Sequence, residues 1–445
     1  MGLPYVANDQ QVQVIAAITR FCARATASDS VFVLCGYAGT GKTSLIGALV
    51  RTLRDVGIRS VLMAPTGRAA KVFAAYSGHP AGTIHRRIYR PPGQGRAFSA
   101  VMDNPFVNTV FIVDEASMIG SAADGTDLLT DLIHYVYSGV NCRLILLGDT
   151  AQLPPVGCAQ SPALDPETLR SYGLHVSRAL LTDTVRQAKS SGILYNATAI
   201  RRAMRRTPLP EPSITTAGFA DVATVEGEDL EELLGSAYAT DGVDETIIVT
   251  RANWRASQFN QAVRARLLGR EEELCRDDLL LVAKNNYYWG AKVPEIEFIA
   301  NGDTARVTRI YGTEERYGFR FADVRLAFPF ASADVECKII LECLTSDSPA
   351  LTAEQQAQLF ERVYNDPALF TESTPHGVRI RAMKTNPHFQ ALQVKYAYAV
   401  TCHKAQGGQW RNVVVDLSAI NPESLTSMEF YRWLYTATTR ATSRL

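Results

Sequence analysis

The sequence predicts an α/β protein built on parallel β-sheets, and two features carry that prediction. Short apolar runs alternate with helical stretches over the first part of the chain, which is the rhythm of βαβ units. A glycine-rich loop also stands between one such run and the helix that follows it. The expected strands of this part are Val31–Cys35, Ser60–Ala64, Thr109–Val113, Arg143–Leu147 and Ala179–Leu181.

The rest of the chain divides into segments that differ in composition and in their pattern of expected strands and helices. A proline- and glycine-rich excursion at 86–106 predicts a hairpin, and residues 207–216 read as a linker. A second α/β segment opens at Thr246–Thr250. Short alternating strands after residue 303 predict a small β-barrel-like insertion, and a capping box begins a helix at 352–364. The α/β pattern then returns in the apolar runs Val394–Thr401 and Asn412–Leu417.

Bulk composition narrows the class of protein. A length of 445 residues is too great for one core and suggests about two to four domains. The chain has 45 basic and 45 acidic residues, so a nucleic-acid surface would have to be a local groove. The eight cysteines include no C-x-x-C pair, which argues against a zinc or iron–sulfur site and fits a reducing cytoplasm. No apolar stretch is long enough to span a membrane, so we expect a cytoplasmic protein without a membrane partner.

The glycine-rich loop has the pattern G-x-x-x-x-G-K-T of a phosphate-binding loop. Its backbone N–H groups can close on phosphates, Lys42 can reach the β- and γ-phosphates, and the Thr43 hydroxyl can bind Mg²⁺. ATP with Mg²⁺ is therefore the expected ligand. The nucleotide-binding residues expected here are Gly36, Ala38, Gly39, Thr40, Gly41, Lys42, Thr43 and Ser44.

Two further strand ends carry polar groups. Asp114 and Glu115 follow a buried strand at the edge where ligands of open parallel sheets bind. Asp114 suits a Mg²⁺ ion and Glu115 suits polarisation of the attacking water. Gln152 follows the next strand and can hydrogen-bond the γ-phosphate or that water. Without the loop, Asp114 and Glu115 would be equally well explained by a helix start, and Gln152 would be better explained by a Gly-Asp turn before a proline-stiffened loop.

Together these motifs resemble superfamily 1 helicases of the 1B branch, the RecD-like and phage Dda-like group. The matches run in family order along nearly the whole chain, from Asn8-Asp9-Gln10-Gln11 through Ala64-Pro65-Thr66-Gly67-Arg68, Thr83-Ile84-His85, the three motifs above, Leu181–Gln187, Asn301-Gly302-Asp303 and Tyr398–Gly407 to Leu434–Ala441. Two departures stand out. Gln409 replaces an acidic residue that the family places near the ribose. The chain also stops at Leu445, where relatives continue with an apolar strand, so the second sheet either lacks an edge strand or belongs to a truncated sequence.

The resemblance implies two RecA-like domains with ATP in the cleft between them. The first would span 1–182 with the hairpin insertion at 86–106. The second would span 183–302 and 393–445, interrupted at 303–392 by an SH3-like barrel. Gln10 would read adenine and Gly407 would contact the nucleotide. Arg186 and Arg440 would act as arginine fingers on the γ-phosphate, beside catalytic Lys42, Glu115 and Gln152.

The same resemblance implies an ATP-dependent DNA helicase that moves 5′ to 3′ on single-stranded DNA and unwinds forked duplex. Single-strand-binding or replication proteins would be its partners, the chain would act as a monomer, and its setting would be DNA replication or repair. The residues of the excursion themselves suggest a strand-separating pin in which Phe98 would stack on the last base at the fork; the alternative is a surface loop whose Phe98 packs on its own domain. The expected DNA contacts are Pro65, Thr66, Arg68, Thr83, His85, Phe98, Thr401, His403 and Lys404. Two alternatives stay open, a P-loop switch that does not translocate and an RNA helicase of the same superfamily.

Overall fold

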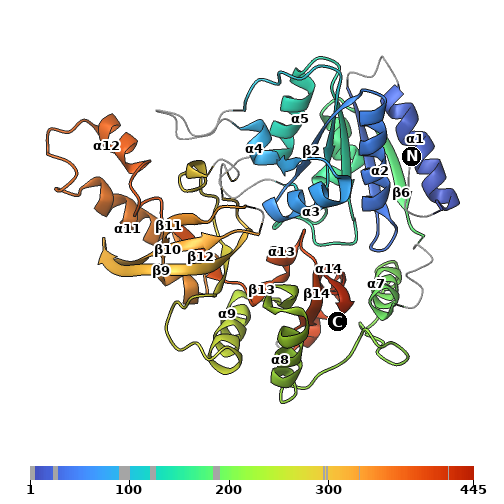
Figure 1. Cartoon of the computed structure of the whole chain (residues 1–445). Coiled ribbons are helices and arrows are strands. Elements are labelled where there is room, and N and C mark those ends of the chain that lie inside the picture. Colours follow the sequence, from blue (N-terminus) through green and yellow to red (C-terminus); the bar gives the residue numbers. More distant parts are fainter. Residues whose placement is uncertain are drawn as a thin grey trace.

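The computed structural model confirms the predicted α/β class and arranges the chain as two parallel sheets and a barrel (Figure 1). It describes residues 6–23, 29–89, 101–120, 127–183, 191–293, 296, 299–329, 331–418 and 420–445. Within that part of the chain, no helix is both long and apolar enough to cross a membrane.

The first sheet is six-stranded and wholly parallel, with the order β3-β2-β4-β5-β1-β6. Its strands are β1 (Ser30–Gly36), β2 (Arg59–Ala64), β3 (Ala81–Thr83), β4 (Thr109–Val113), β5 (Arg143–Gly148) and β6 (His175–Leu181). Its helices are α1 (Asp9–Ala23), α2 (Lys42–Asp55), α3 (Gly67–Ser77), α4 (Ile84–Ile88), α5 (Leu128–Ser138) and α6 (Pro166–Ser171).

Alternate residues of β1 enter two separate cores. Val31, Val33 and Cys35 pack into one core, and Phe32 and Leu34 pack into the other. A strand that is apolar on both sides must be covered on both faces, which explains why its sequence is a continuous apolar run rather than an alternating one. The sheet edge at the ends of β1, β4 and β5 is thereby held on a rigid base.

The second sheet has the order β13-β7-β14-β15 and is also parallel. Its strands are β7 (Thr246–Thr250), β13 (Ala399–Thr401), β14 (Trp410–Val415) and β15 (Ala441–Arg444). The helices of this part are α7 (Gly192–Ala203), α8 (Leu230–Asp241), α9 (Asn253–Ala262), α13 (Cys402–Ala405) and α14 (Met428–Thr438). Because β15 pairs with β14, the expectation that this sheet could lack an edge strand is wrong. The polar run after Arg440 forms the strand through backbone hydrogen bonds.

A closed five-stranded barrel interrupts the second sheet, consistent with the expected SH3-like insertion. Its strands are β8 (Leu279–Val282), β9 (Thr304–Arg316), β10 (Phe319–Ala327), β11 (Val335–Ile340) and β12 (Leu392–Tyr396). The helices inserted here are α10 (Glu342–Thr345), α11 (Ala353–Tyr364) and α12 (His376–Met383). The expected capping box of Thr352 and Gln355 is present on α11. The barrel draws its strands from a wider segment than 303–392, since β8 lies before it.

The predicted hairpin at 86–106 is described only at its base. Tyr89 and Val101 form an antiparallel bridge, and Met102 N–H donates to Ile88 O over 2.7 Å. The tip, which includes Phe98, lies outside the described residues, as does Arg186.

Candidate nucleotide cleft and strand-binding surface

The phosphate-binding loop joins β1 to α2 in a conformation that its glycines permit. Gly39 and Gly41 have φ values of 74° and 75°, in the left-handed region that residues with a Cβ rarely adopt. Gly41 thereby caps the N-terminus of α2, whose first residue is Lys42. The Lys42 ammonium group donates to Gly36 O over 3.3 Å, so the lysine lies back across the loop. This arrangement aims backbone N–H groups and one cation at the same space.

The two carboxylates at the end of β4 are held in an unusual backbone geometry. Glu115 has φ 52° and ψ 36°, a left-handed conformation that is uncommon outside glycine. Its N–H donates to Asp114 Oδ1 over 2.8 Å. Burial and the adjacent Glu115 raise the pKa of Asp114 to about 6. The Glu115 Oε2 atom is buried and has no hydrogen-bond partner among the described residues. A buried unpaired carboxylate oxygen is costly, and it marks a position that a ligand can satisfy.

The polar residues at the end of β5 complete this edge. Gln152 is 7% exposed, and its Oε1 atom has no partner in the described part of the chain. Asp149 is buried and accepts hydrogen bonds from Ala151 N–H over 2.9 Å and from the Tyr435 hydroxyl over 2.7 Å. Tyr435 lies on α14, so this contact ties the first sheet to the second.

One cleft of about 400 Å³ collects most of the predicted catalytic and nucleotide-binding residues. Residues from both sheets line it, because α14 and β15 approach the loop from the second sheet. The predicted residues in its lining are Ala38, Gly39, Thr40, Gly41, Lys42, Thr43, Ser44, Asp114, Glu115, Gln152, Gly407 and Arg440. Gln409, the departure from the family pattern, also lines it, whereas Gly36 and Gln10 do not.

Arg440 is buried at the cleft wall and held in place by three acceptors. Its guanidinium group donates to Thr436 O over 3.0 Å, to Gly408 O over 3.1 Å and to Thr439 Oγ1 over 3.1 Å. A planar guanidinium with fixed acceptors is pre-organised, so little entropy is lost when it meets a phosphate. The second predicted finger, Arg186, lies in the segment that the structure does not describe.

The two glutamines of the first predicted motif have different partners. Gln10 donates to Thr182 Oγ1 over 2.8 Å and accepts from Thr182 N–H over 2.8 Å, which connects α1 to the end of β6. Gln11 is 1% exposed and donates to Thr40 O over 3.0 Å. Gln11, which no expected role singled out, therefore supports the phosphate-binding loop directly.

Tyr435 is the other residue that the sequence analysis missed. Its hydroxyl accepts from Ala38 N–H over 2.9 Å while it donates to Asp149, and burial raises its pKa well above 10. Next to it, Thr436 Oγ1 accepts from Leu153 N–H over 2.9 Å. The partners lie hundreds of residues away in the chain, so no local pattern could have revealed these contacts.

The predicted strand-binding residues of the first sheet fall into two groups. Thr66 and Thr83 are N-caps, accepting from Ala69 N–H and Arg86 N–H, both over 3.2 Å. An N-cap oxygen accepts, so its own O–H can still donate to a phosphate. Pro65 and His85, the other two predicted contacts beside them, are partly exposed.

Arg68, another predicted DNA contact of the first sheet, reaches the second sheet. Its guanidinium lies 3.8 Å from the centre of the Trp410 ring and donates to Gln409 O over 3.2 Å. Burial lowers its pKa to about 10. The structure therefore places Arg68 as a bridge between α3 and the second sheet, and its predicted DNA contact stays a prediction.

On the second sheet, Thr401, His403 and Lys404 lie together at the start of α13. His403 is exposed, and Lys404 Nζ donates to Asn301 Oδ1 over 2.6 Å. Asp303, two residues further on, forms an ion pair with Lys71 of α3 over 3.2 Å. The motif Asn301-Gly302-Asp303 thus links α13 to α3 of the first domain.

Comparisons with known proteins agree with this arrangement. Residues 7–207 match the model of an AAA domain, and residues 396–445 match the model of a UvrD-like helicase C-terminal domain. The ATP-dependent RecD2 DNA helicase of Deinococcus radiodurans is 37% identical over 130 residues, which cover 29% of this chain and 17% of that protein. The RecBCD enzyme subunit RecD of Mycolicibacterium smegmatis is 28% identical over 48% of this chain and 40% of its own length. The chain therefore matches less than half the length of these two relatives.

The fold has solved counterparts. A Bacteroides Pif1 helicase in complex with ADP-AlF3 and single-stranded DNA aligns with a TM-score of 0.50 and 16% identity, over 99% of this chain and 91% of that one. At that identity the likeness speaks for the fold alone. The two family models, the RecD2 match and the family order of the motifs together support a place for this chain among the superfamily 1 DNA helicases of the RecD- and Pif1-like branch.

Proposed function

We propose that this chain hydrolyses ATP in the cleft between its two sheets and uses the reaction to move 5′ to 3′ along single-stranded DNA and to open forked duplex. One observation carries the proposal. Lys42 and Glu115 from the first sheet and Arg440 from the second line the same cleft. A binding module needs no cation from a second sheet at the phosphates, whereas phosphoryl transfer gains from one.

The side chains have complementary tasks in that reaction. Lys42 and Arg440 offset the charge on the transferring phosphoryl group, and an arginine there can contribute several kcal/mol, roughly 10³-fold or more in rate. Glu115 and Gln152 each hold a buried oxygen without a partner in the described structure, which suits them to orient the attacking water.

A magnesium site fits the same residues. Thr43 and Asp114 line the cleft beside the loop, and a hydroxyl with a carboxylate is an oxygen ligand set that Mg²⁺ accepts. Asp114 has a raised pKa because it is buried beside Glu115, so a nearby cation would favour its ionised form. A bound Mg²⁺ would offset the charge of the β- and γ-phosphate oxygens.

Movement requires that the cleft and the strand-binding residues communicate. Tyr435 contacts both the phosphate-binding loop and Asp149, and Arg440 extends from the same helix end. A change at the phosphates therefore displaces α14 relative to the first sheet. Thr66 and Thr83 lie on one sheet and Thr401 on the other, so such a displacement alters the spacing between the proposed grips on the strand.

ATP hydrolysis with and without single-stranded DNA tests the activity. Strong stimulation by DNA is expected, whereas a P-loop switch would show little. Preferential stimulation by RNA would favour the RNA-helicase alternative. The proposed direction rests on the resemblance of Thr83-Ile84-His85 and Asn301-Gly302-Asp303 to RecD-like signatures, and strand displacement tests it. Opening of a duplex with a 3′ tail but not of one with a 5′ tail would contradict the direction.

A further inference from the structure

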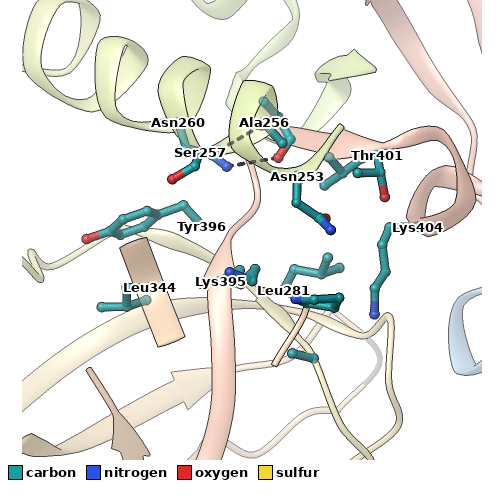
Figure 2. A pocket seen from close by; sticks show the side chains of 14 residues that line it. Asn253, Ala256, Ser257, Asn260, Leu281, Leu344, Lys395, Tyr396, Thr401 and Lys404 are labelled. Carbon is teal, nitrogen blue, oxygen red and sulfur yellow. Dashed lines mark hydrogen bonds between the residues drawn. The ribbon is translucent and has the colours of Figure 1, made fainter. Parts of the chain in front are cut away.

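A second cavity, of about 190 Å³, adjoins the nucleotide cleft, and we call it the rear cavity. The buried side chains of Asp149 and Gln152 line both spaces, so they form the boundary between them. Arg178 of β6, which is exposed, lines the outer end of the rear cavity. The described lining includes none of the expected DNA contacts, unlike the pocket in Figure 2, which Thr401 and Lys404 line.

The rear cavity and the nucleotide cleft lie on opposite faces of the first sheet. Helices α2 and α3 line the cleft, and both pack on the core that contains Phe32 and Leu34. Leu164, just before α6, lines the rear cavity and packs into the core on the other side of β1. A small product formed beside Gln152 therefore has a second way out, and ADP that still fills the cleft does not obstruct it.

The buried part of the rear cavity carries polar atoms that the protein leaves unpaired. Ser117 Oγ, Gln152 Oε1 and Arg432 Nε are buried and have no hydrogen-bond partner among the described residues. Ser117 is only 1% exposed. Buried polar atoms without partners are costly, so they mark positions that a ligand can satisfy. Hydrogen phosphate suits this mixed set, because its oxygens accept from the serine and the arginine and its P–OH group can donate to the glutamine.

Two arginines give the rear cavity positive charge. Among the described residues, Arg178 donates to Cys35 Sγ over 3.9 Å, and Arg432 of α14 donates to Ala159 O, so their printed partners are neutral. Burial lowers the pKa of Arg432, as expected for a cation that has lost water without gaining a counter-charge. An anion that enters the cavity would supply that charge.

The two carboxyl groups in the lining offset this charge only in part. Asp165 caps α6, and hydrogen bonds from Thr168 lower its pKa, so it stays ionised. Burial raises the pKa of Asp149, which weakens the negative charge at the boundary with the cleft. The volume also limits the ligand. It is below the roughly 300–1,000 Å³ of pockets for larger organic molecules, but it exceeds the about 10–15 Å³ that one water needs many times over.

We propose that the phosphate cleaved from ATP leaves through the rear cavity while ADP still occupies the cleft, bound on its way by Ser117 and Arg432. The proposal rests on the proposed ATP hydrolysis and adds the route of one product. Gln152 separates the two spaces, and rotation of its side chain opens the passage. Because Arg432 lies on α14, a phosphate in the cavity bridges the two sheets, and its departure removes that bridge. The simpler alternative is a water-filled gap in which Arg432 only holds the loop at Ala159.

Rapid mixing with ATP and saturating oligo-dT separates cleavage from release in the first turnover. Acid quenching measures all the phosphate formed, whereas a fluorescent phosphate-binding protein measures only the phosphate that has left. Ser161→Trp puts a large side chain at a partly exposed position of the cavity lining. Cleavage should keep its wild-type rate, and free phosphate should lag far behind it. Ser171→Trp, at an exposed position of α6 outside the lining, is the matched control and should show no added lag.

A second variant tests the charge. Arg432→Met should delay free phosphate relative to cleavage by roughly tenfold, the loss expected when one hydrogen bond to a charged group is removed. Added inorganic phosphate should also inhibit steady-state hydrolysis less, with half-inhibition at a roughly tenfold higher concentration. Arg170→Met is the control, because Arg170 is exposed on α6 and does not line the cavity.

Thermal melts establish that each variant folds, and the exposed lining residue Gln160 offers the substitution Gln160→Trp if Ser161→Trp does not. Free phosphate that appears together with cleavage in the folded tryptophan variant would overturn the route. Wild-type release and wild-type inhibition by phosphate in Arg432→Met would overturn the role of that arginine. Either result leaves ATP hydrolysis standing, whereas a wild-type protein that cleaves no ATP would overturn the proposed function itself.

Discussion

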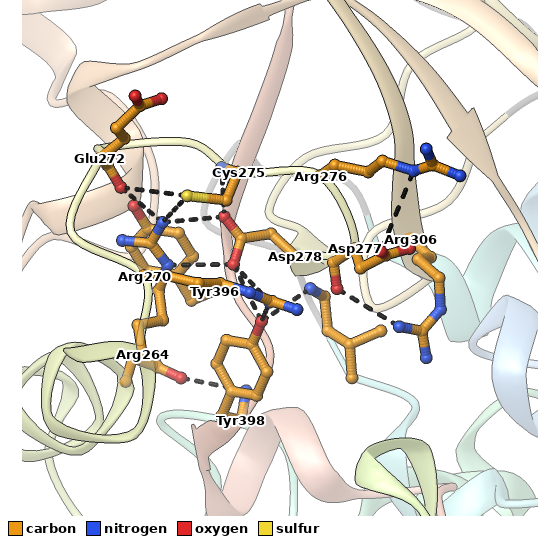
Figure 3. Close-up of polar contacts among 12 residues, drawn as sticks. Arg264, Arg270, Glu272, Cys275, Arg276, Asp277, Asp278, Arg306, Tyr396 and Tyr398 are labelled. Atoms are coloured by element: carbon orange, nitrogen blue, oxygen red, sulfur yellow. Dashed lines mark hydrogen bonds and ion pairs between the residues drawn. The ribbon is translucent and has the colours of Figure 1, made fainter. Parts of the chain in front are cut away.

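Replacing Asp278 by asparagine should destabilise this protein more than any comparable change at its surface. The Asp278 carboxylate is 0% exposed and collects the donors of one buried cluster (Figure 3). Arg264 donates twice, over 3.0 and 2.9 Å, and Arg270 donates over 2.8 Å. The Tyr398 hydroxyl donates over 2.9 Å and Cys275 N–H over 2.7 Å. One carboxylate therefore forms ion pairs with two arginines near the junction of α9, β8 and β13.

The size of the effect follows from what the substitution leaves behind. Asp278→Asn keeps the shape but removes the negative charge, and the new amide N–H₂ faces donors rather than acceptors. Arg264 is 7% exposed at its side chain, so water cannot replace its partner. Breaking a buried ion pair on one side costs about 3–5 kcal/mol. In a domain of this size, a loss of that much unfolding free energy lowers the melting temperature by roughly 10 °C.

The control is the same chemical change at an exposed pair. Glu231 and Arg266 approach within 4.0 Å with side chains 49% and 71% exposed. Glu231→Gln should change stability by less than about 0.5 kcal/mol. Urea unfolding followed by circular dichroism at neutral pH compares the variants. If Asp278→Asn unfolds at the same urea concentration as Glu231→Gln, the claim that the Asp278 carboxylate stabilises the buried cluster is refuted.

Four further predictions concern the nucleotide cleft. Lys42→Ala should abolish ATP hydrolysis with little effect on fold or DNA affinity, and substantial DNA-stimulated turnover would exclude the assigned role. Arg440→Ala should lower kcat by about 10³-fold and nucleotide affinity far less; loss of binding with kcat intact would mark Arg440 as a ground-state contact. Tyr435→Phe should lower the free energy of unfolding by about 1–3 kcal/mol and should reduce the stimulation of ATP hydrolysis by DNA more than hydrolysis without DNA. An unchanged melting temperature and unchanged stimulation would contradict the proposal that the Tyr435 hydroxyl couples the two sheets. Asp114→Asn should stabilise the nucleotide-free protein at pH 7, because the pKa of Asp114 is raised to about 6 in the fold. In the wild type that destabilising contribution develops as pH rises from about 4 to 6 and vanishes below this window, so calorimetry should show the two proteins converging in acid and diverging above it.

Local patterns predicted most of the fold because strands buried on both faces are continuous apolar runs. The run Thr109–Val113 became β4 without a change of bounds. By contrast Ala81–Thr83 is a strand with no apolar pattern, since its short edge position buries little. The apolar run Val394–Thr401 contributes to two strands. It divides because β12 pairs with β8 in the barrel and β13 pairs with β7 in the sheet.

In the candidate site, too, residues in short motifs could be predicted from the sequence, whereas residues whose partners are distant in the chain could not. Lys42, Asp114 and Glu115 lie in short motifs whose chemistry is legible from their spacing. The positions of Tyr435 and Arg68 depend on partners from the other sheet. A local sequence pattern cannot predict contacts between residues so far apart in the chain. Arg68 lies within a family motif, but its sequence neighbours do not show that its guanidinium packs on the ring of Trp410.

The way in which the chain enters and leaves the barrel bears on how this protein can change in length. The entering strand β8 and the departing strand β12 are antiparallel neighbours, with Val394 opposite Val282. Helices α11 and α12 project from the barrel on the side away from both sheets (Figure 1). Insertions or deletions of residues between Thr345 and Leu392 therefore leave the positions where the chain enters and leaves the barrel unchanged. Natural variants of this chain should differ in size mainly there, and a foreign domain inserted at the exposed turn near Ser373 should leave ATP hydrolysis intact.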